Sequence, residues 1–261
     1  MTATEPPAAI VTGATSGIGL AIARHLAARG HRVYIGARTQ ENVTATVKQL
    51  LDEQLDVAGT TVDVRSTDSV RAFVQAATGR FGPVAVLVNN AGRPGGGVTA
   101  SITDEAWDDI IDTNLNSVFR MTREVLNAGG MAARSRGRII SIASTAGKQG
   151  VVLGAPYSAS KHGVVGFTKA LGNELAPAGI TVNAVCPGYV ETPMAQHVRQ
   201  NYAAIYGTTP DAVRAKFEAK IPLGRYCTPD EVAGLVGYLA SDAAAAITAQ
   251  AMNVCGGLGN F

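Results

Sequence analysis

The run Tyr157-Ser158-Ala159-Ser160-Lys161 has residue types and a spacing suited to acid–base chemistry. Tyr157 and Lys161 are four positions apart, so they share one face if this run is helical. A phenol has a pKa near 10 and is a poor acid at pH 7 unless its ionised form is favoured. A nearby ammonium, together with a positively charged cofactor ring, would lower that pKa by about 2–3 units. The spacing therefore predicts that Tyr157 transfers a proton with the help of Lys161.

Ser144 lies upstream of this run, at the expected end of a strand. Its hydroxyl can donate a hydrogen bond to a substrate oxygen on which negative charge develops. Acid–base catalysis by a positioned tyrosine would accelerate a proton-transfer step about 10²–10⁴-fold. Because a Tyr-x3-Lys spacing alone is common and mostly structural, the surrounding motifs must decide whether the pair is catalytic.

A glycine-rich turn, Thr12 to Gly19, joins the first expected strand directly to a helix. Glycines let the backbone turn sharply and let a pyrophosphate approach the free N–H groups at a helix start. The spacing is Gly-x3-Gly-x-Gly rather than the commoner GxGxxG, which makes it a weak signal by itself. Its place after the first strand predicts dinucleotide binding by Gly13, Thr15, Ser16, Gly17, Ile18 and Gly19.

The end of the second expected strand indicates which dinucleotide is bound. An acid there would hold the ribose 2′-hydroxyl of NAD, whereas an arginine accommodates the 2′-phosphate of NADP. The sequence has Gly36-Ala37-Arg38 and no acid. Arg38 therefore predicts NADPH, because a guanidinium pairs bidentately with a phosphate that a carboxylate would repel. Asp63 and Val64, expected at the end of the third strand, would suit the adenine edge.

Seven short β-branched runs alternate with longer segments of helical periodicity. They are AAIVT near the start and residues 31–37, 57–64, 84–90, 137–144, 180–186 and 251–255. Continuous apolar runs are typical of strands buried on both faces, and the repeated β-then-α order predicts a parallel sheet with right-handed crossovers. The fourth run leads into Asn90, Ala91 and Gly92, whose small size would let a cofactor lie close across the sheet. No repeat or linker interrupts residues 1–261, which are expected to form one α/β domain.

Composition excludes several classes of function. Lys and Arg number 22 against 20 Asp and Glu, so nothing indicates a nucleic acid or membrane partner. No 18-residue apolar run exists, and the start MTATEPPAAI lacks the basic segment of a secretion signal, so a cytoplasmic location is expected. Cys186, Cys227 and Cys255 match no zinc or disulfide pattern and are expected to be reduced, buried thiols; no metal site is predicted.

Together these motifs resemble the short-chain dehydrogenase/reductase family. The likeness spans nearly the whole chain and rests on TGATSGIG, NNAG, Asn114, Ser144, YSASK, and Pro187-Gly188 with Thr192. It implies a Rossmann-like, doubly wound parallel sheet of about seven strands with helices on both faces. It also implies that Tyr157 is the proton donor, that Ser144 orients the substrate and that Lys161 bonds the nicotinamide ribose. The cofactor contacts would include Asn90, Ala91, Gly92, Tyr157, Lys161, Pro187, Gly188, Val190 and Thr192.

Asn114, inside DDIIDTNLNSVFR, matches a further family position. In that family an asparagine within a helix disrupts the helix ladder and holds a water joined to the lysine, which gives a proton relay. Asparagine lowers helix propensity, so a compensating role is reasonable, although a tolerated interior asparagine is the alternative. His162 follows Lys161 directly and must point to another face, so it is interpreted as structural.

A narrower resemblance is to the ketoreductases of bacterial aromatic (type II) polyketide synthases. It rests on NNAGRPGGG, STAGKQGVV, APYSASKHGVVGFTKALG, VCPGYVETPMA and NVCGGLGNF. It implies NADPH-dependent reduction of one carbonyl, typically at C9, of a poly-β-ketone carried on an acyl carrier protein, by a homotetramer. The Pro-Gly-Gly segment of those enzymes is linked to the stereochemistry of reduction, and Pro94, Gly95 and Gly96 match it near the substrate entrance.

Residues 193–221 are a long polar and aromatic excursion, of the kind that often forms a lid over a binding site. A long, flat substrate needs a roomy pocket with scattered aromatic and hydrogen-bonding groups. The expected lining comprises Met194, Tyr202, Tyr206 and Phe217 on one wall and Gln149 and Val151 opposite, and Thr145 is a further expected substrate contact. The alternative is that the aromatics only pack the lid helices.

Arg38, Arg65 and Arg93 each follow one of three expected parallel strands, so they should gather at one end of the sheet. They could form a basic rim for the phosphopantetheine phosphate or for the acidic carrier protein. Arg38 is also expected to bind the cofactor phosphate, which weakens its assignment to this rim. Surface arginines without function are the alternative for Arg65 and Arg93. Two other functions stay open: a fatty-acid 3-oxoacyl-acyl-carrier-protein reductase, and a non-catalytic dinucleotide sensor on the same fold.

Overall fold

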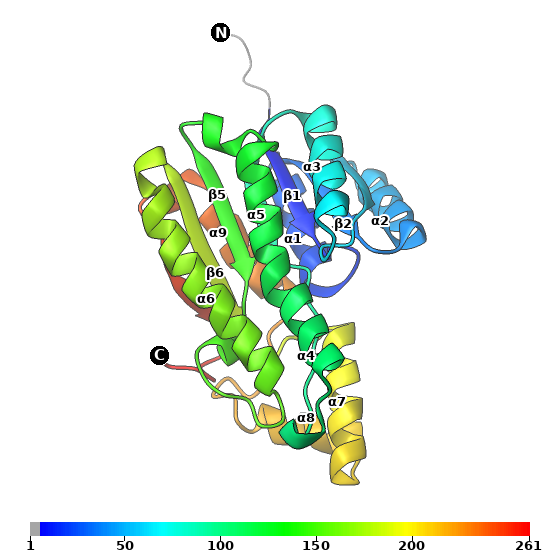
Figure 1. Cartoon of the computed structure of the whole chain (residues 1–261). Coiled ribbons are helices and arrows are strands. Elements are labelled where there is room, and N and C mark those ends of the chain that lie inside the picture. The colour runs from blue at the N-terminus through cyan, green and yellow to red at the C-terminus, as the bar shows by residue number, and fades with distance from the viewer. Residues whose placement is uncertain (1–5) are drawn as a thin grey trace.

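Seven apolar runs form the strands of one parallel sheet in the computed structural model, which describes residues 6–261 (Figure 1). The strands are β1 (Ala8–Thr12), β2 (Arg32–Ala37), β3 (Val57–Thr61), β4 (Val84–Asn89), β5 (Gly137–Ile142), β6 (Ile180–Pro187) and β7 (Ala251–Val254). They lie in the order β3-β2-β1-β4-β5-β6-β7. The order reverses between β1 and β4, and in such sheets ligands bind outside the carboxyl ends of the strands at this reversal.

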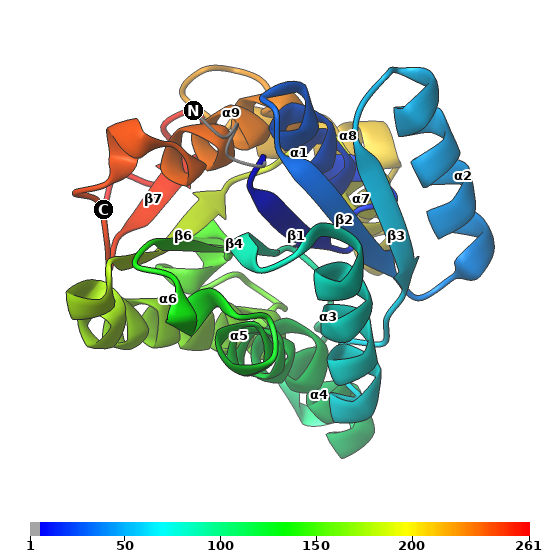
Figure 2. The same ribbon diagram turned by 90° about the horizontal axis from the view of Figure 1, so that it is seen from above.

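Helices cover both faces of the sheet, as Figure 2 shows from above. One face carries α1 (Gly17–Ala28), α2 (Gln40–Asp52) and α9 (Pro229–Ala240), and the other carries α3 (Thr67–Phe81), α5 (Ser117–Asn127) and α6 (Ala155–Leu175). Ile22 and Val236 are fully buried on the first face, and Phe73 and Val125 on the second. The doubly wound fold expected from the alternating runs is confirmed.

The other helical segments lie in the connections. They are η1 (Thr99–Ser101), α4 (Asp104–Ile111), the π turn η2 (Asp112–Asn116), η3 (Met131–Ala133), η4 (Thr145–Gly147), η5 (Ala176–Ala178), α7 (Pro193–Tyr206), α8 (Pro210–Glu218) and η6 (Asp242–Ala244). Helices α4, α7 and α8 gather at the end of the molecule toward which the strand arrows point (Figure 1). They therefore surround the edge at which a ligand is expected.

β4 and β7 end one residue before their expected runs, and two other strands end earlier still. β3 ends at Thr61 and not at Val64, and β5 ends at Ile142 and not at Ser144. The Asp63 backbone N–H is bonded to the Ser69 hydroxyl, and the Ser144 hydroxyl accepts a bond from the Ala146 N–H. These local bonds to serine hydroxyls replace the bonds of the sheet. Asp63 and Ser144 therefore lie just beyond the strands rather than in them.

The segment 193–221 is mostly helical. Thr192 and Thr209 begin α7 and α8, and each hydroxyl accepts a bond from a backbone N–H three residues later. The two helices enclose a small core of Ala203, Val213, Phe217, Ile221 and Tyr226, against which Tyr189, Ala195 and Tyr202 pack. We call residues 193–221 the lid segment.

Some expectations concern what the chain lacks. No helix within residues 6–261 combines the length and the apolar character needed to cross a membrane. Residues 1–5, which open the stretch compared with a secretion signal, lie outside the described residues. Across the described part of the chain, no three His, Cys, Asp or Glu side chains gather in a way that could hold a metal ion. Cys186, Cys227 and Cys255 are free and buried, as predicted.

Candidate active site

The glycine turn after β1 packs against the end of β4 without room for side chains. A Cβ on Gly19 would lie 2.2 Å from the Gly13 carbonyl oxygen and 2.4 Å from the Asn90 Nδ2 atom. Asn90 donates from that atom to the Thr12 and Gly13 carbonyls, at 2.9 and 3.0 Å. The Thr12 hydroxyl accepts bonds from the Asn90 and Ala91 N–H groups. The turn is therefore held tightly against the end of β4, at the reversal of the sheet order.

Helix α1 begins at this turn without a side-chain cap. Ser16 is exposed and extended at its start, and its hydroxyl accepts no bond from the helix. The lid helices, by contrast, are capped by Thr192 and Thr209. Uncapped N–H groups at the positive end of a helix are suited to an anion. The turn from Gly13 to Gly19 thus fits the pyrophosphate of a dinucleotide.

Arg38 follows β2 at the same edge of the sheet. It is exposed and forms no ion pair with another residue of the described chain. Asp63 lies nearby: hydrogen bonds from Arg65 hold its pKa below the usual range, and the charge of Arg38 adds a smaller lowering. The geometry therefore leaves the Arg38 guanidinium open to a phosphate, whereas Asp63 is already engaged.

The segment after β6 closes the cofactor side of the site. The Gly188 N–H donates to the Val254 carbonyl at 3.0 Å, and Val190 is buried beside Cys227. A Cβ on Gly17 would lie 3.1 Å from the Thr192 methyl carbon. The segment from Pro187 to Thr192 thus lies against the glycine turn, which brings together two predicted cofactor segments far apart in the sequence.

Tyr157 lies in the first turn of α6, within hydrogen-bond distance of Ser144. Burial raises the pKa of the Tyr157 phenol, and the bond with Ser144 offsets part of that rise. The chain alone therefore raises this pKa, and the predicted lowering by Lys161 together with a positively charged cofactor ring stays a prediction. Desolvation penalises the phenolate more than any neighbouring group of the chain stabilises it.

Lys161 is buried one turn further along α6. Its ammonium donates to the Ile142 carbonyl at 2.8 Å and lies 5.7 Å from the centre of the Tyr157 ring. Burial lowers the pKa of Lys161 to about 8. The two side chains do share one face, as their spacing predicted, but the lysine does not bond the phenol directly.

Asn114 lies in the π turn η2 between α4 and α5 and is almost fully buried. Its side-chain oxygen accepts from the Arg93 N–H at 2.8 Å, and its amide donates to the Arg93 carbonyl and to the Ser160 hydroxyl. Ser160 in turn donates to the Tyr157 carbonyl. π turns often mark functional sites, and this one replaces the regular helix ladder at the predicted position.

The segment Pro94-Gly95-Gly96 touches the loop that precedes Tyr157. A Cβ on Gly96 would lie 1.9 Å from the Leu153 carbonyl oxygen, and the backbone there has φ +155°. The neighbouring Gly97 N–H donates to that same oxygen at 2.8 Å. On the other side, Gly95 packs on Ile110 of α4. The segment therefore connects α4 to the start of the catalytic helix.

The expected substrate lining is only partly brought together. The Tyr202 hydroxyl donates to the Val152 carbonyl at 2.8 Å, so the lid segment meets the loop that carries Val151. Phe217 is buried and stacks on Tyr189 with ring centres 4.6 Å apart, which favours the alternative that it packs the lid helices. Three exposed or half-exposed residues, Gln149, Val151 and Met194, stay free for contact, whereas Thr145 is buried in η4.

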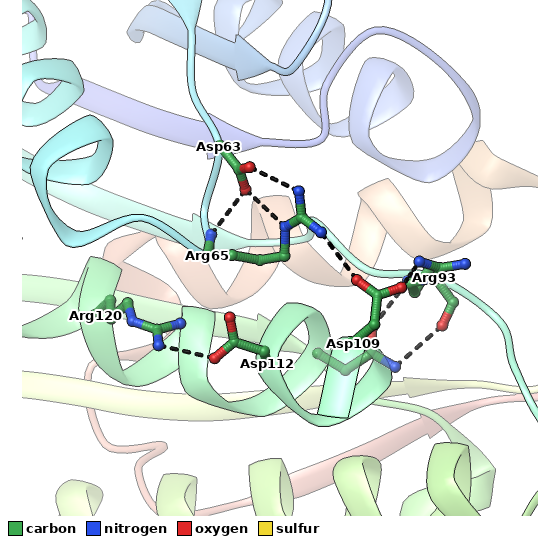
Figure 3. A network of polar contacts seen from close by, with 7 residues as sticks. Asp63, Arg65, Arg93, Asp109, Asp112 and Arg120 are labelled. Carbon is green, nitrogen blue, oxygen red and sulfur yellow. Dashed lines mark hydrogen bonds and ion pairs between the residues drawn. The ribbon is translucent and has the colours of Figure 1, made fainter. Parts of the chain in front are cut away.

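The three arginines of the expected rim lie at this edge, but two of them are paired. Arg65 bonds Asp63 through its Nε and Nη2 atoms, and Arg65 and Arg93 both form ion pairs with Asp109 of α4 (Figure 3). Sequence reasoning missed Asp109 because an acid in the run DDIID is typical of a solvated helix face. It missed Ser160 because a serine inside YSASK gives no sign of its partner.

His162 is exposed, and its ring Nδ1 bonds the Ser158 carbonyl one turn earlier. Its structural role stays a prediction.

Comparisons with known proteins agree with this geometry. The family model described as short chain dehydrogenase matches residues 7–203. The chain is similar to the monensin polyketide synthase putative ketoacyl reductase of Streptomyces virginiae, 74% identical over 261 residues and covering 100% of both chains. It is 41% identical over 254 residues to the 3-oxoacyl-acyl-carrier-protein reductase FabG of Escherichia coli (strain K12), covering 97% of this chain and 98% of the relative. A crystal structure of a variant actinorhodin polyketide ketoreductase with NADPH has a TM-score of 0.97 and 58% identity, covering 100% of both chains.

Proposed function

We propose that this chain, which belongs to the short chain dehydrogenase family, is an NADPH-dependent ketoreductase of aromatic polyketide biosynthesis. Its substrate is a poly-β-ketone on an acyl carrier protein, of which it reduces one carbonyl of the C9 type. The observation that carries the proposal is the meeting of Tyr157, Ser144 and Lys161 beside Gly92, at the edge where the glycine turn and Arg38 lie. The similarity to the monensin ketoacyl reductase supports the substrate class.

The chemistry divides between the cofactor and three side chains. When bound, NADPH supplies a hydride for the carbonyl carbon. Tyr157 gives its proton to the carbonyl oxygen, and its raised pKa keeps the phenol protonated at neutral pH until that oxygen becomes basic. Ser144 donates a hydrogen bond to the same oxygen as its negative charge develops. Lys161, whose pKa is about 8, is mostly charged at pH 7 and would bond the nicotinamide ribose of the bound cofactor.

Asn114 is the fourth residue assigned to the catalytic machinery, in addition to Tyr157, Ser144 and Lys161. Its side chain is held by the Arg93 backbone and by Ser160. The π turn around it interrupts the regular backbone bonding of the helix, so that a water joined to Lys161 can be held there. Asn114 thereby supports a proton relay from Lys161 toward solvent.

A steady-state comparison with the fused-ring ketone trans-1-decalone tests the cofactor and the substrate class together. We expect kcat/KM to be higher with NADPH than with NADH. The variant Arg38→Gln should lower kcat/KM for NADPH about tenfold, because it removes a charge-assisted contact with the 2′-phosphate. The NADH value should not change. Oxidation of NADPH or of NADH, followed by the absorbance of the cofactor, gives the rates of both proteins.

Arg134→Gln is the matched control, since Arg134 is exposed and lies before β5, at the opposite edge of the sheet. Equal use of NADH and NADPH by the wild type would contradict the assignment of Arg38. Faster turnover of short 3-oxoacyl thioesters than of trans-1-decalone would favour the fatty-acid reductase. Binding of NADPH without any hydride transfer would favour the sensor.

The Pro94-Gly95-Gly96 segment is proposed to line the substrate entrance, which gives a second prediction. Gly96→Ala should lower kcat/KM for trans-1-decalone at least tenfold, because the new Cβ must displace the Leu153 carbonyl and shift the loop before Tyr157. Gly97→Ala is the control: its φ is also positive, at +152°, but its Cβ would meet no atom closer than 3.9 Å. If both variants lose the same activity, backbone strain rather than the Leu153 contact explains the loss.

The same proposal names the residues that contact the carrier protein and the polyketide. Arg65 and Arg93 form a basic rim that receives the phosphopantetheine phosphate of the carrier protein, and Arg38 beside them holds the 2′-phosphate of the cofactor. Gln149, Val151, Met194 and Tyr202, with Thr145 behind them, contact the polyketide.

The enzyme is further proposed to act as a homotetramer in the cytoplasm. Trp107 of α4 and Phe119 of α5 are large exposed apolar side chains that are available for subunit contact.

A further inference from the structure

Two arginines from different segments bind the same carboxylate at the edge of the site. Arg65 follows β3 and Arg93 follows β4, and both guanidinium groups form ion pairs with Asp109 of α4 (Figure 3). Arg65 reaches one carboxylate oxygen at 3.0 Å, and Arg93 reaches the other. The two cations are therefore spaced to hold one anionic group between them, and a side chain of the protein holds that position.

We propose that Asp109 occupies a phosphate-binding site formed by Arg65 and Arg93 and that the phosphate of the carrier arm must displace it. This inference rests on the proposed function, because it names the group that the basic rim receives. Guanidinium groups bind phosphate in the same bidentate manner as carboxylate. Asp109 thus acts as an internal competitor that sets the affinity for the arm.

The contacts around the pair would keep both arginines in place after Asp109 leaves. Arg65 remains bonded to Asp63 through two nitrogens, at 3.0 and 2.8 Å. Arg93 is fixed through its backbone, since its N–H and its carbonyl both bond the Asn114 side chain. The Arg65 guanidinium therefore keeps its position without Asp109, and the Arg93 backbone keeps its side chain at the same edge, where its guanidinium can contact an incoming anion.

Exchange of Asp109 for a phosphate should be easy in energetic terms. The side chains of Arg65 and Arg93 keep 38% and 47% of their surface exposed, and ion pairs with such exposure contribute little. A phosphate monoester carries more charge than a carboxylate at pH 7. The position next to Pro94 and Gly95 places the site at the entrance, where the arm of a carrier-bound substrate must lie.

Asp109→Asn tests the proposal in the enzyme saturated with NADP, so that the cofactor phosphates are already bound. The ligands are 4′-phosphopantetheine and pantetheine, which differ only in the phosphate, and calorimetry gives Kd for each. We expect the variant to bind 4′-phosphopantetheine about three- to tenfold more tightly than the wild type, because a competing charge is removed. Its Kd for pantetheine should stay the same.

Asp108→Asn is the matched control, because Asp108 is exposed, adjacent and of the same charge but forms no ion pair with another described residue. Tighter binding in both variants would reflect net charge alone and would overturn the proposal. So would unchanged or weaker binding in Asp109→Asn, or an equal gain for pantetheine. Reduction of trans-1-decalone by the wild type is measured beside these titrations; if it is absent, the proposed function fails independently of Asp109.

Discussion

Tyr157→Phe is expected to slow the reduction of trans-1-decalone by about 10²–10⁴-fold. The substitution removes the hydroxyl that gives its proton to the carbonyl oxygen and leaves the ring in place. The phenol of Tyr157 lies near Ser144 and is not part of the two main hydrophobic core clusters. The variant should therefore keep the fold and the affinity for NADPH. Single-turnover oxidation of NADPH measures the chemical step, and fluorescence of the bound cofactor measures its affinity.

Tyr238→Phe serves as the control for this loss. Tyr238 lies on α9 with an exposed side chain, so the loss of its hydroxyl should leave turnover unchanged. If Tyr157→Phe reduces the ketone at the wild-type rate while it is folded and saturated with NADPH, another group must donate the proton. The assignment of Tyr157 would then be wrong.

The second large effect concerns Lys161 and depends on pH. Its pKa in the folded protein is lowered from 10.5 to about 8, because burial disfavours the ammonium. Below pH 8 the folded and the unfolded chain both hold this proton. Between pH 8 and 10.5 only the unfolded chain keeps it, so the penalty for burying the charge disappears and the wild type gains stability.

Relative to Lys161→Met, the free energy of unfolding of the wild type should therefore rise by about 2 kcal/mol between pH 7 and pH 9.5. Urea titrations of both proteins at the two pH values measure this difference. Lys169→Met is the control, since Lys169 is exposed on the same helix. A flat difference for Lys161→Met, or the same change for Lys169→Met, would contradict the lowered pKa. Ketone reduction should also be lost in Lys161→Met but not in Lys169→Met.

The sheet could be predicted because its strands are continuous apolar runs separated by helical periodicity. All seven runs became strands, and the turn Thr12 to Gly19 lies where its glycines indicated. The strand ends were less predictable. Asp63 and Ser144 look like continuations of β-branched runs, but each uses its polar atoms in a local turn instead of the sheet. Such local competition depends on backbone angles that residue types alone do not specify.

Residue types and spacing also placed Tyr157 and Lys161 on one helix face. The pKa of each group could not be inferred in this way, because it depends on how deeply the folded chain buries the charge. The role of Asp109 was hidden for a related reason. Its partners Arg65 and Arg93 are distant in the sequence and meet it only because β3 and β4 end at the same edge as α4.

The aromatic cluster beneath α7 and α8 has a consequence for how product leaves. Its members all come from residues 189–226, so α7 and α8 pack around a hydrophobic core that is separate from the core of the sheet. Units with separate cores open as cooperative blocks rather than by fraying. A bulky alcohol can thus depart while α7 and α8 swing away together, with the Tyr202 bond to Val152 broken and the edge-to-face contact between the Tyr202 and Phe217 rings intact.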